Sequence, residues 1–392
     1  MGRLLFLSNG HGEDLNASLI AAACRRLGGV EVWALPLVGT GQAYRRLDIP
    51  IIGPTRALPS GGMVYMNPWL LVRDVLAGLP HLTWQQWQTV RRVAPSCDLI
   101  MAVGDGVPLT LARLSGRPYA AFIVSTSSYY EGVLKLPVLT WWGLQSPRCL
   151  QVFTRDALTA QHLQQRGMSK ARFAGYPILD GLEPSGQPLN PHPVVALLPG
   201  SRFPEAAENL RLLLRFCYSL FALRPQVHIW AALVPGFTKP LLDELAHQAG
   251  WGHQDGQLRS DRGTVYYSQS RFADIVSASR VVVGMAGTAI EQAVGLGKPV
   301  IQIPGRGPQF TYRFAEAQMR LLGCSVQTVG RGPAGNRELQ QAAQWVDRIL
   351  DDETYHQRCR ENGSERVARG EGAAGIAQVL LWLLASPVAA QQ

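Results

Sequence analysis

The stretch Gly284-Met-Ala-Gly-Thr-Ala-Ile-Glu291 decides how the rest of this chain is interpreted. It follows the apolar run Val281-Val282-Val283 and opens a helical pattern from Thr288 to Leu296, which predicts a strand, a glycine turn and a helix. The first N–H groups of such a helix have no partner within it, and glycines let a ligand approach the backbone closely. Glu291, one turn into the helix, can accept hydrogen bonds from sugar hydroxyls. A nucleotide with a diphosphate and a ribose is therefore the first hypothesis.

A purely structural interpretation of the same residues is also available. The segment Thr288-Ala-Ile-Glu291 fits a capping box, in which the Thr and Glu side chains satisfy backbone N–H groups at the helix start. Taken alone, the stretch favours this capping role over a ribose contact. Other motifs of the chain are needed to distinguish the capping role from the ribose contact.

Composition narrows the class of ligand. The chain has 392 residues, enough for two domains, and its 47% hydrophobic residues can fill two cores. The formal net charge of +9 implies attraction to anions. The sequence has no lysine-arginine block, zinc-ligand spacing or RNA-binding signature. Phosphorylated small molecules and an anionic membrane surface are therefore better candidates than nucleic acid.

The cysteines and the N-terminal segment indicate the compartment. The six cysteines are scattered without a CxxC pair, which is typical of free thiols in a reducing compartment. The first apolar run is too short for a signal peptide, and no apolar stretch reaches the roughly 18 residues of a spanning helix. We expect a cytoplasmic protein, with peripheral contact to the inner face of a membrane as a further option.

Strands alternate with helices in both halves, which predicts an α/β protein with parallel, doubly wound sheets. The first half opens with a strand at Arg3–Ser8, a loop at 9–14 and a helix from Leu15 to Leu27. The second half restarts with a strand at Val194–Leu198.

The division of the chain follows from this restart. We expect one Rossmann-like domain over residues 1–183 and a second over residues 194–370. The intervening segment Glu183–Pro193 is rich in Pro, Gly and Ser and is the best linker candidate.

Two segments combine aromatic and basic residues. The span Gly61–Thr89 is crowded with Leu, Met and Trp, and Arg73, Arg91 and Arg92 lie within it or just after it. A second such stretch is Val133–Trp142. Amphipathic elements of this kind can lie on a membrane surface or hold a lipid acceptor. A helix buried against its own domain explains the pattern equally well.

A second phosphate-suited turn is Leu198-Pro-Gly-Ser-Arg202. Gly200 allows a tight turn, Ser201 can cap the following helix, and Arg202 can reach a diphosphate with a forked, permanently charged donor. The alternative is a surface ion pair between Arg202 and Glu205. Its place after the first strand of the second half favours the functional interpretation.

A third loop, Pro304–Gln309, follows a strand on the same edge. Gln309 can hydrogen-bond the hydroxyls of a donor sugar, although a plain turn is nearly as good an explanation. The sequence contains no Walker pattern, no GxGxxG after the first strand and no GxSxG, which argues against the corresponding NTPase, dinucleotide-binding and hydrolase classes.

The first half supplies candidates for a general base. His11, Glu13, Asp14 and Asp105 are expected at the carboxyl ends of strands, where ligands bind in such sheets. Transfer of a sugar needs a base that deprotonates the attacking hydroxyl. Glu13 and Asp14 are equally explained as acids that stabilise a helix start. Asp105 and His11, both flanked by glycine, are the better candidates, and the residues alone do not rank them.

These residues resemble a known family. Leu197–Arg202 with Glu205, together with Gly287–Glu291, look like the donor-site motifs of lipid-A-disaccharide synthase. Gly104-Asp105-Gly-Val-Pro108 resembles the aspartate motif of that family, whose first Asp is regarded as catalytic. Gly175–Asp180 resembles the segment before its interdomain linker. The order of the motifs is kept over most of the chain.

The first loop departs from that family. Its pattern there is Ser-Gly-Glu-Ala-Ser-Gly-Asp, whereas this chain has Ser8-Asn-Gly-His-Gly-Glu-Asp14. A glycine-flanked histidine is closer to relatives that glycosylate diacylglycerol or the peptidoglycan lipid precursor. The chain therefore resembles a lipid-A-disaccharide synthase-related protein more than the synthase.

The resemblance implies the GT-B architecture, with two Rossmann-like domains facing across a cleft and a C-terminal helix at 371–392 crossing back to the N-terminal domain. It implies a UDP-sugar donor in the second half, with Glu291 on the ribose and the Gly287-Thr288 helix start and the Gly200-Ser201-Arg202 turn on the diphosphate. The first half would hold a lipid-linked acceptor, with Asp105 or His11 as base.

Such enzymes typically invert the anomeric centre, with no metal or cofactor besides the UDP-sugar co-substrate. A UDP-N-acetylglucosamine 2-epimerase and a non-enzymatic nucleotide-sugar-binding protein are the alternatives.

Overall fold

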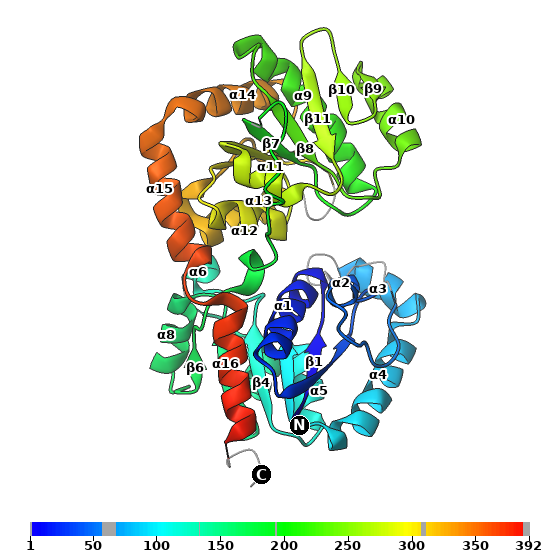
Figure 1. Cartoon of the computed structure of the whole chain (residues 1–392), viewed down its shortest axis with the longest axis vertical. Helices are drawn as coiled ribbons and strands as arrows, with labels where there is room; N and C mark the ends of the chain where they lie inside the picture. The colour runs from blue at the N-terminus through cyan, green and yellow to red at the C-terminus, as the bar shows by residue number, and fades with distance from the viewer. Residues whose placement is uncertain (1, 57–67, 133, 193, 307–310, 387–392) are drawn as a thin grey trace. The chain divides into compact units, whose positions relative to one another are not determined.

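The computed structural model describes residues 2–56, 68–132, 134–192, 194–306 and 311–386. The chain divides into two compact units (Figure 1). The first combines residues 1–181 with residues 369–392, and the second comprises residues 182–368. Each unit contains one sheet with helices packed on it.

The sheet of the first unit is parallel throughout and has the strand order β2-β1-β3-β4-β5-β6. Its central strands are almost continuously apolar because helices cover both faces. The chain places β2 on one side of β1 and β3 on the other, so the order reverses between β1 and β3. The strands are β1 (Gly2–Ser8), β2 (Val30–Pro36), β3 (Leu99–Val103), β4 (Tyr119–Ile123), β5 (Cys149–Thr154) and β6 (Ala171–Arg172).

The helices of the first unit enclose this sheet. One core contains Ile100 of β3 together with Val90 of α4 and Leu144 of α7. On the other side, α16 lies alongside α1 (Figure 1). The helical elements are α1 (His11–Leu27), α2 (Gln42–Arg46), α3 (Pro68–Leu76), α4 (Leu79–Val93), η2 (Ala94–Ser96), α5 (Gly106–Leu114), α6 (Ser128–Glu131), α7 (Val138–Leu144), α8 (Ala157–Gln165), η3 (Pro177–Leu179) and α16 (Gly372–Ala385).

The segment Gly175–Asp180 anchors the returning chain. The carboxylate of Asp180 accepts a hydrogen bond from the backbone N–H of Ala373 through Oδ2 at 2.6 Å. Gly175 pairs with Gly370 in an antiparallel bridge. A Cβ atom on Gly175 would collide with the backbone nitrogen of Gly372, so the close approach requires glycine.

The sheet of the second unit has the order β14-β13-β12-β7-β8-β11-β10-β9. Strands β14 to β11 pair in parallel, and β9 and β10 form an antiparallel hairpin at one edge. The order reverses between β7 and β12. The strands are β7 (Val195–Leu198), β8 (Ile229–Ala232), β9 (Gly252–Gln254), β10 (Gln257–Arg259), β11 (Thr264–Ser268), β12 (Val281–Gly284), β13 (Val300–Gln302) and β14 (Val326–Thr328).

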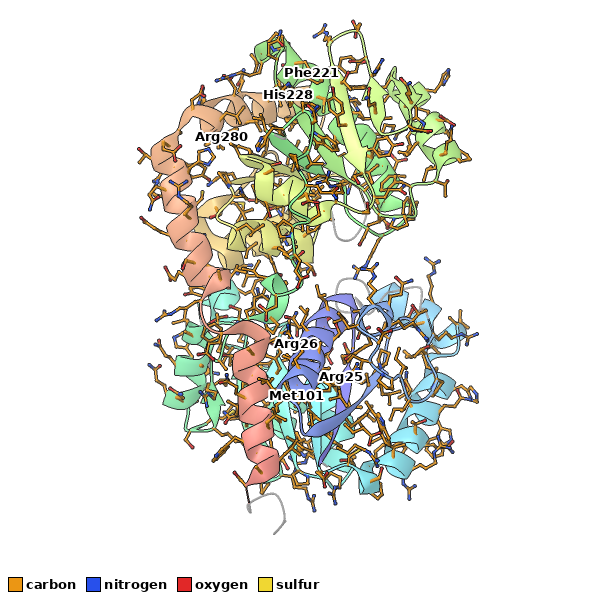
Figure 2. All side chains as sticks on the ribbon, viewed as in Figure 1. Arg25, Arg26, Met101, Phe221, His228 and Arg280 are labelled. Carbon is orange, nitrogen blue, oxygen red and sulfur yellow. The ribbon has the colours of Figure 1, made fainter. Side chains whose placement is uncertain are left out.

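The core of the second unit contains the apolar faces of α9, α10 and α14 together with the sheet. Figure 2 labels Phe221 of α9 in this interior and Met101 of β3 in the first unit, both buried. The helical elements are α9 (Glu205–Leu223), α10 (Lys239–Ala249), α11 (Phe272–Ala278), α12 (Thr288–Gly295), α13 (Tyr312–Leu322), η4 (Gly323–Ser325), α14 (Asn336–Asp351), α15 (Glu353–Gly363) and the π-helical turn η5 (Ser364–Ala368).

Helix α1 begins earlier than the sequence predicts. It starts at His11 instead of Leu15, so most of the expected loop at 9–14 is helical. Gly10 takes φ 147°, a conformation that favours glycine, and its carbonyl accepts a hydrogen bond from the Asp14 N–H at 2.8 Å. The glycines that suggested a loop therefore form the tight entry to the helix.

The segment expected as a linker is bound along the second unit. The Ser185 N–H donates to Asp274 Oδ1 at 2.7 Å, and Trp230 Nε1–H donates to the Pro191 carbonyl at 2.8 Å. Arg271 also donates to the Gln187 carbonyl. These contacts fix the described residues of this segment to β8 and α11.

Candidate functional site

Two polar loops meet at the switch point of the first sheet, where the strand order reverses between β1 and β3. Asn9 directly follows β1, and Asp105 lies between β3 and α5. The side-chain amide of Asn9 donates from Nδ2 to Asp105 Oδ1 at 2.9 Å. This bond joins the carboxyl ends of the two strands where the strand order reverses, the position at which open α/β sheets bind ligands.

Asp105 is also the N-cap of α5. Its Oδ1 accepts a second hydrogen bond, from the Val107 N–H, at 2.9 Å. Burial raises the pKa of the Asp105 carboxyl above its usual value, while hydrogen bonds from backbone N–H groups oppose that rise. A carboxylate held in this way has a fixed orientation and a greater affinity for a proton than one in water.

Glu13 lies against the same two loops. A Cβ atom built on Gly104 would lie 3.2 Å from Glu13 Cγ and 3.8 Å from Asn9 Oδ1, and one built on Gly10 would collide with the Glu13 carboxylate. Glycines at both positions therefore give Glu13 its place beside Asn9. The sequence indicated Glu13 as an acid at a helix start, and it does lie in the first turn of α1.

Asp14 belongs to a buried network behind these loops. Ser8 Oγ donates to Asp14 Oδ1 at 2.6 Å and lies 2.7 Å from Tyr44 Oη. Burial raises the pKa of Asp14 to about 7, which the hydrogen bond from Ser8 only partly opposes. Because Asp14 and Tyr44 are both buried, the network supports the end of β1 from within.

The structure places His11 by its backbone alone. It is the first residue of α1, two residues after Asn9. Its side chain lies outside the described part of the structure, so its role as a base remains a prediction. Asn9, which the sequence analysis did not single out, is the residue that links the two loops.

The second switch point is closed by two glycine turns. The Met285 N–H donates to the Leu198 carbonyl at 3.2 Å. A Cβ atom on Gly284 would collide with that same carbonyl, so the strand ends can approach this closely only with glycine. The turn at 199–202 and the turn at 284–287 are thereby adjacent on one sheet edge.

Neither expected helix cap forms. Helix α12 begins at Thr288 with Gly287 as its cap residue, and no side chain caps it, so Thr288 is one position too late for a capping box. Helix α9 begins at Glu205 with Pro204 as its cap residue, so Ser201 does not cap it. Thr288 and Ser201 are therefore not the cap residues of these helices, whereas the ion pair between Arg202 and Glu205 stays a prediction.

The remaining predicted donor residues are Gly200, Arg202, Glu291 and Gln309. Gly200 has φ 95°, which a tight turn with glycine requires. Arg202 and Glu291 are both half-buried, at the turn after β7 and in the first turn of α12. Gln309 lies outside the described residues.

Buried amides that the sequence analysis missed hold both turns. Asn209 donates to the Pro199 carbonyl at 2.9 Å, and Gln318 donates to the Gly287 carbonyl at 3.3 Å. Both side chains are buried. Neither residue carries a recognisable motif, so only the folded structure could identify them.

The first unit exposes apolar side chains on the two segments noted for their aromatics. On α3 and α4, Leu76 is 82% and Trp84 is 56% exposed, whereas Trp87 packs against the core. On α7, Val138 is 83% exposed. Trp142 is partly covered by the Arg113 guanidinium, whose Cζ atom lies 3.9 Å from the centroid of the Trp142 ring. Each segment thus has exposed apolar side chains as well as apolar side chains that pack against the core.

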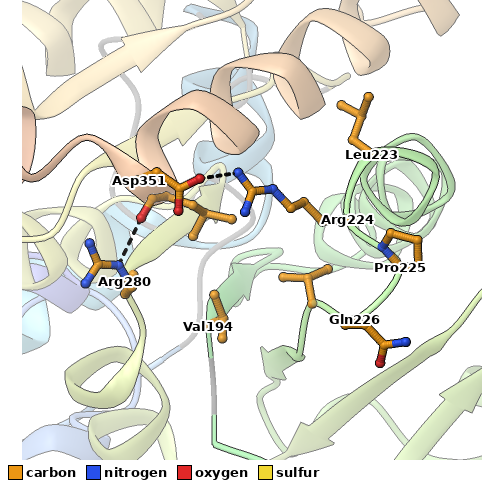
Figure 3. A pocket seen from close by; sticks show the side chains of 9 residues that line it. Val194, Leu223, Arg224, Pro225, Gln226, Arg280 and Asp351 are labelled. Carbon is orange, nitrogen blue, oxygen red and sulfur yellow. Dashed lines mark hydrogen bonds and ion pairs between the residues drawn. The ribbon is translucent and has the colours of Figure 1, made fainter.

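A groove of the second unit lies away from the two glycine turns. It has a volume of about 720 Å³ and is lined by residues that precede β7, β8 and β12, so it lies at the amino ends of the strands. Figure 3 shows its charged groups paired, with Arg224 on Asp351 and Arg280 Nε donating to the Leu350 carbonyl at 3.2 Å. It contains none of the predicted donor residues and joins α9 to α14.

Among the residues that the structure describes, no group of three or more His, Cys, Asp or Glu side chains is arranged to hold a metal ion. No helix within the same ranges is long and apolar enough to cross a bilayer.

Comparison by sequence finds no family model that matches the chain and no curated protein that matches it. Solved structures match it over nearly their full lengths. A UDP co-structure of MnaA from S. aureus has a TM-score of 0.62 at 14% identity and covers 98% of this chain and 97% of that one. A putative UDP-N-acetylglucosamine 2-epimerase from Listeria monocytogenes has a TM-score of 0.61 at 12% identity, covering 96% and 94%.

CalG4, the calicheamicin glycosyltransferase, has a TM-score of 0.60 at 17% identity and covers 98% of both chains. The likeness thus extends to glycosyltransferases and 2-epimerases alike. These comparisons confirm the predicted fold class: the chain has two Rossmann-like α/β units of the GT-B type.

Proposed function

We propose that this chain is a UDP-sugar-dependent, inverting glycosyltransferase, similar to lipid-A-disaccharide synthase-related proteins, that transfers a hexose or N-acetylhexosamine to a lipid-linked acceptor. One observation carries the proposal: each of the two sheets presents a polar site at its switch point. In the first unit the site is the Asn9–Asp105 pair, and in the second it is the two glycine turns beside Arg202.

The second unit is proposed to hold the donor. Gly200, Ser201 and Arg202 would bind the diphosphate together with Gly287 and Thr288 at the start of α12, because backbone N–H groups and a guanidinium both favour anions. Glu291 would accept hydrogen bonds from the ribose hydroxyls.

The first unit is proposed to hold the acceptor and the base. The acceptor oxygen attacks the anomeric carbon from the face opposite the diphosphate, the bond from that carbon to the phosphate oxygen breaks, and UDP leaves with the electron pair. Asp105 takes the proton of the acceptor hydroxyl. Because the hydrogen bonds from Asn9 and Val107 both end on Oδ1, Oδ2 is the proposed proton acceptor.

The lipid portion of the acceptor is proposed from the exposed apolar side chains of the first unit. Leu76, Trp84 and Val138 are all more than half exposed. Arg73, Arg91 and Arg92 are exposed on the same helical segment, whereas the acid within it, Asp74, is buried. An apolar surface with cations beside it suits acyl chains and an anionic membrane face.

Turnover with a lipid extract tests the proposal. The full-length chain is incubated with UDP-glucose, UDP-galactose or UDP-N-acetylglucosamine and membrane lipids, and both UDP release and glycolipid mass are measured. We expect one donor to yield UDP and a lipid heavier by one sugar residue. UDP release without a glycosylated lipid, or no release with any donor, would contradict it.

A 2-epimerase is the second candidate, because structures described as UDP-N-acetylglucosamine 2-epimerases are among the matches. Its activity requires no acceptor. Proton NMR of UDP-N-acetylglucosamine incubated with the chain alone would then show the C2 epimer. Conversion without lipid would replace the transferase proposal with this one.

A further inference from the structure

Two buried amides reach the proposed diphosphate turns from inside the second unit. Asn209 lies on α9, and its Nδ2 donates to the Pro199 carbonyl at 2.9 Å. Gln318 lies on α13, and its Nε2 donates to the Gly287 carbonyl at 3.3 Å. The turns follow the neighbouring strands β7 and β12, so the two amides act on the same edge of the sheet.

The orientation of Gln318 is itself fixed. Gln302, which is fully buried at the end of β13, donates from Nε2 to Gln318 Oε1. Thr328 Oγ1 of β14 donates to Gln302 Oε1 at 3.0 Å. Each group donates to the next until the chain ends on the Gly287 carbonyl, and connected hydrogen bonds of this kind strengthen one another.

These bonds also direct the neighbouring N–H groups. In a planar trans peptide the carbonyl and the following N–H point in opposite directions. Because the Pro199 carbonyl points to Asn209, the Gly200 N–H points away from α9. Because the Gly287 carbonyl points to Gln318, the Thr288 N–H points away from α13. Both N–H donors are therefore directed away from the helices that carry the amides.

Packing alone does not explain an asparagine at position 209. Its Oδ1 is buried and has no hydrogen-bond partner among the residues that the structure describes. A buried polar atom without a partner is unfavourable, and a leucine of similar size would avoid it. The donor function of the amide toward the turn is the remaining reason for its presence.

We infer that Asn209 and Gln318 are positioning residues that hold the Gly200 and Thr288 N–H groups ready for the diphosphate of a nucleotide. The inference rests on the donor site proposed above. Neither side chain is assigned a contact with the ligand. Their contribution is to fix the donors before binding, so that less conformational freedom is lost when the anion arrives.

Calorimetric titration with UDP and with uridine isolates this effect, because only UDP carries the diphosphate. The variants are Asn209→Leu, Gln318→Met and Gln318→Glu, the last of which keeps the shape but loses the donor. We expect each to weaken UDP binding about tenfold, which is about 1.4 kcal/mol. Uridine binding should change by less than twofold.

Asn362→Leu is the matched control in the same unit. Its amide donates to the Leu322 carbonyl at 2.7 Å and to Ser325 Oγ at 2.8 Å. This variant loses amide hydrogen bonds that end on neither turn and should bind UDP within twofold of the wild type.

The outcomes separate the inference from the donor site itself. If the wild type binds UDP no more tightly than uridine, the proposed donor site is wrong. If the wild type prefers UDP but the variants keep that preference, the positioning role is wrong and the donor site stands. Equal weakening of UDP and uridine would also contradict the positioning role, since it would reflect general disruption of the unit.

Discussion

The two switch points share a topology but differ in their polar groups. In the first unit the loops after β1 and β3 bring together Asn9, Glu13 and Asp105, with Asp14 buried behind them. In the second unit the corresponding loops after β7 and β12 carry glycine turns, with Arg202 two residues after Gly200. The sheet topology sets where each site lies. The residues of the loops set its chemistry, with carboxylates that can accept a proton in the first unit and a cation with backbone N–H groups that suit an anion in the second.

The support behind each edge differs as well. The first edge rests on a hydroxyl and a carboxyl, because Ser8 joins Asp14 to Tyr44. The second edge rests on amides, Asn209 and Gln318. Amides do not titrate, so the second site should keep its geometry across a pH range in which Asp14 changes its charge. The comparison therefore predicts that a change in pH or a mutation at one sheet edge affects that unit and leaves the other unchanged.

The largest effect should come from Asp105→Asn. The amide keeps the shape of the side chain but cannot accept the proton, so we expect turnover to fall about 10³-fold, within the range for loss of a general base. UDP affinity, which we propose to belong to the second unit, should stay within twofold. Sugar transfer to the lipid acceptor and calorimetry measure the two quantities.

Asp98→Asn is the matched control for that experiment. Asp98 precedes β3 at its amino end, where Oδ2 accepts a hydrogen bond from the Arg3 N–H at 2.7 Å. It should retain its activity. Full turnover by the Asp105 variant would remove the proton-accepting role from Asp105 and favour His11.

The next effect concerns the pH dependence of stability. Burial raises the pKa of Asp14 to about 7, so the folded chain keeps a proton that the unfolded chain releases near pH 4. The stabilisation is complete below the unfolded pKa and is lost as pH rises through about 7. Between pH 5 and pH 8 this loss should be about 3 kcal/mol.

Urea unfolding of the wild type and of Asp14→Asn at both pH values measures this loss. Asp105 and Asp180 also have pKa values raised by burial, but they are present in both proteins and cancel in the difference. The variant should lose about 3 kcal/mol less than the wild type between pH 5 and pH 8. Equal pH dependence of the two proteins would show that Asp14 is ionised in the folded state.

The sequence predicted more of the second edge than of the first. Its glycine turns are local, and their strand-turn-helix order is visible in the residues themselves. The start of α1 was misplaced because Gly10 and Gly12 look like loop residues, although Gly10 forms the entry to the helix. The β9–β10 hairpin was missed because its two three-residue strands carry little apolar alternation.

The supporting residues could not be predicted at all. Gln318 reaches a carbonyl 31 positions away, and Asn9 reaches a carboxylate 96 positions away. Such pairs depend on which strands become neighbours, and the residue pattern along one strand does not contain that information. Motifs therefore reveal turns, whereas the groups that hold those turns appear only in the fold.

A smaller effect should distinguish the ribose from the diphosphate. Glu291→Ala should weaken both UDP and uridine about tenfold, because both ligands carry the ribose. Arg202→Met should weaken UDP by a similar factor and leave uridine within twofold. Calorimetry with the two ligands measures both variants. If Glu291→Ala leaves uridine binding unchanged, the ribose contact is wrong and the similarity of this site to a UDP-sugar site is weakened.

The smallest effect tests whether the first unit alone depends on the returning C-terminal segment. Asp180→Ala removes the acceptor of the Ala373 N–H at the start of α16 and should lower the free energy of unfolding by about 1 kcal/mol, the usual effect of losing a cap. Asp180→Asn keeps an acceptor oxygen and should lose only a few tenths. Hydrogen exchange should accelerate in α16 and in the adjoining α1, while UDP affinity stays unchanged because the proposed donor turns belong to the other unit. Faster exchange in α12 or weaker UDP binding would show that the two edges are coupled, and the separation of a proton-accepting unit from an anion-binding unit would then fail.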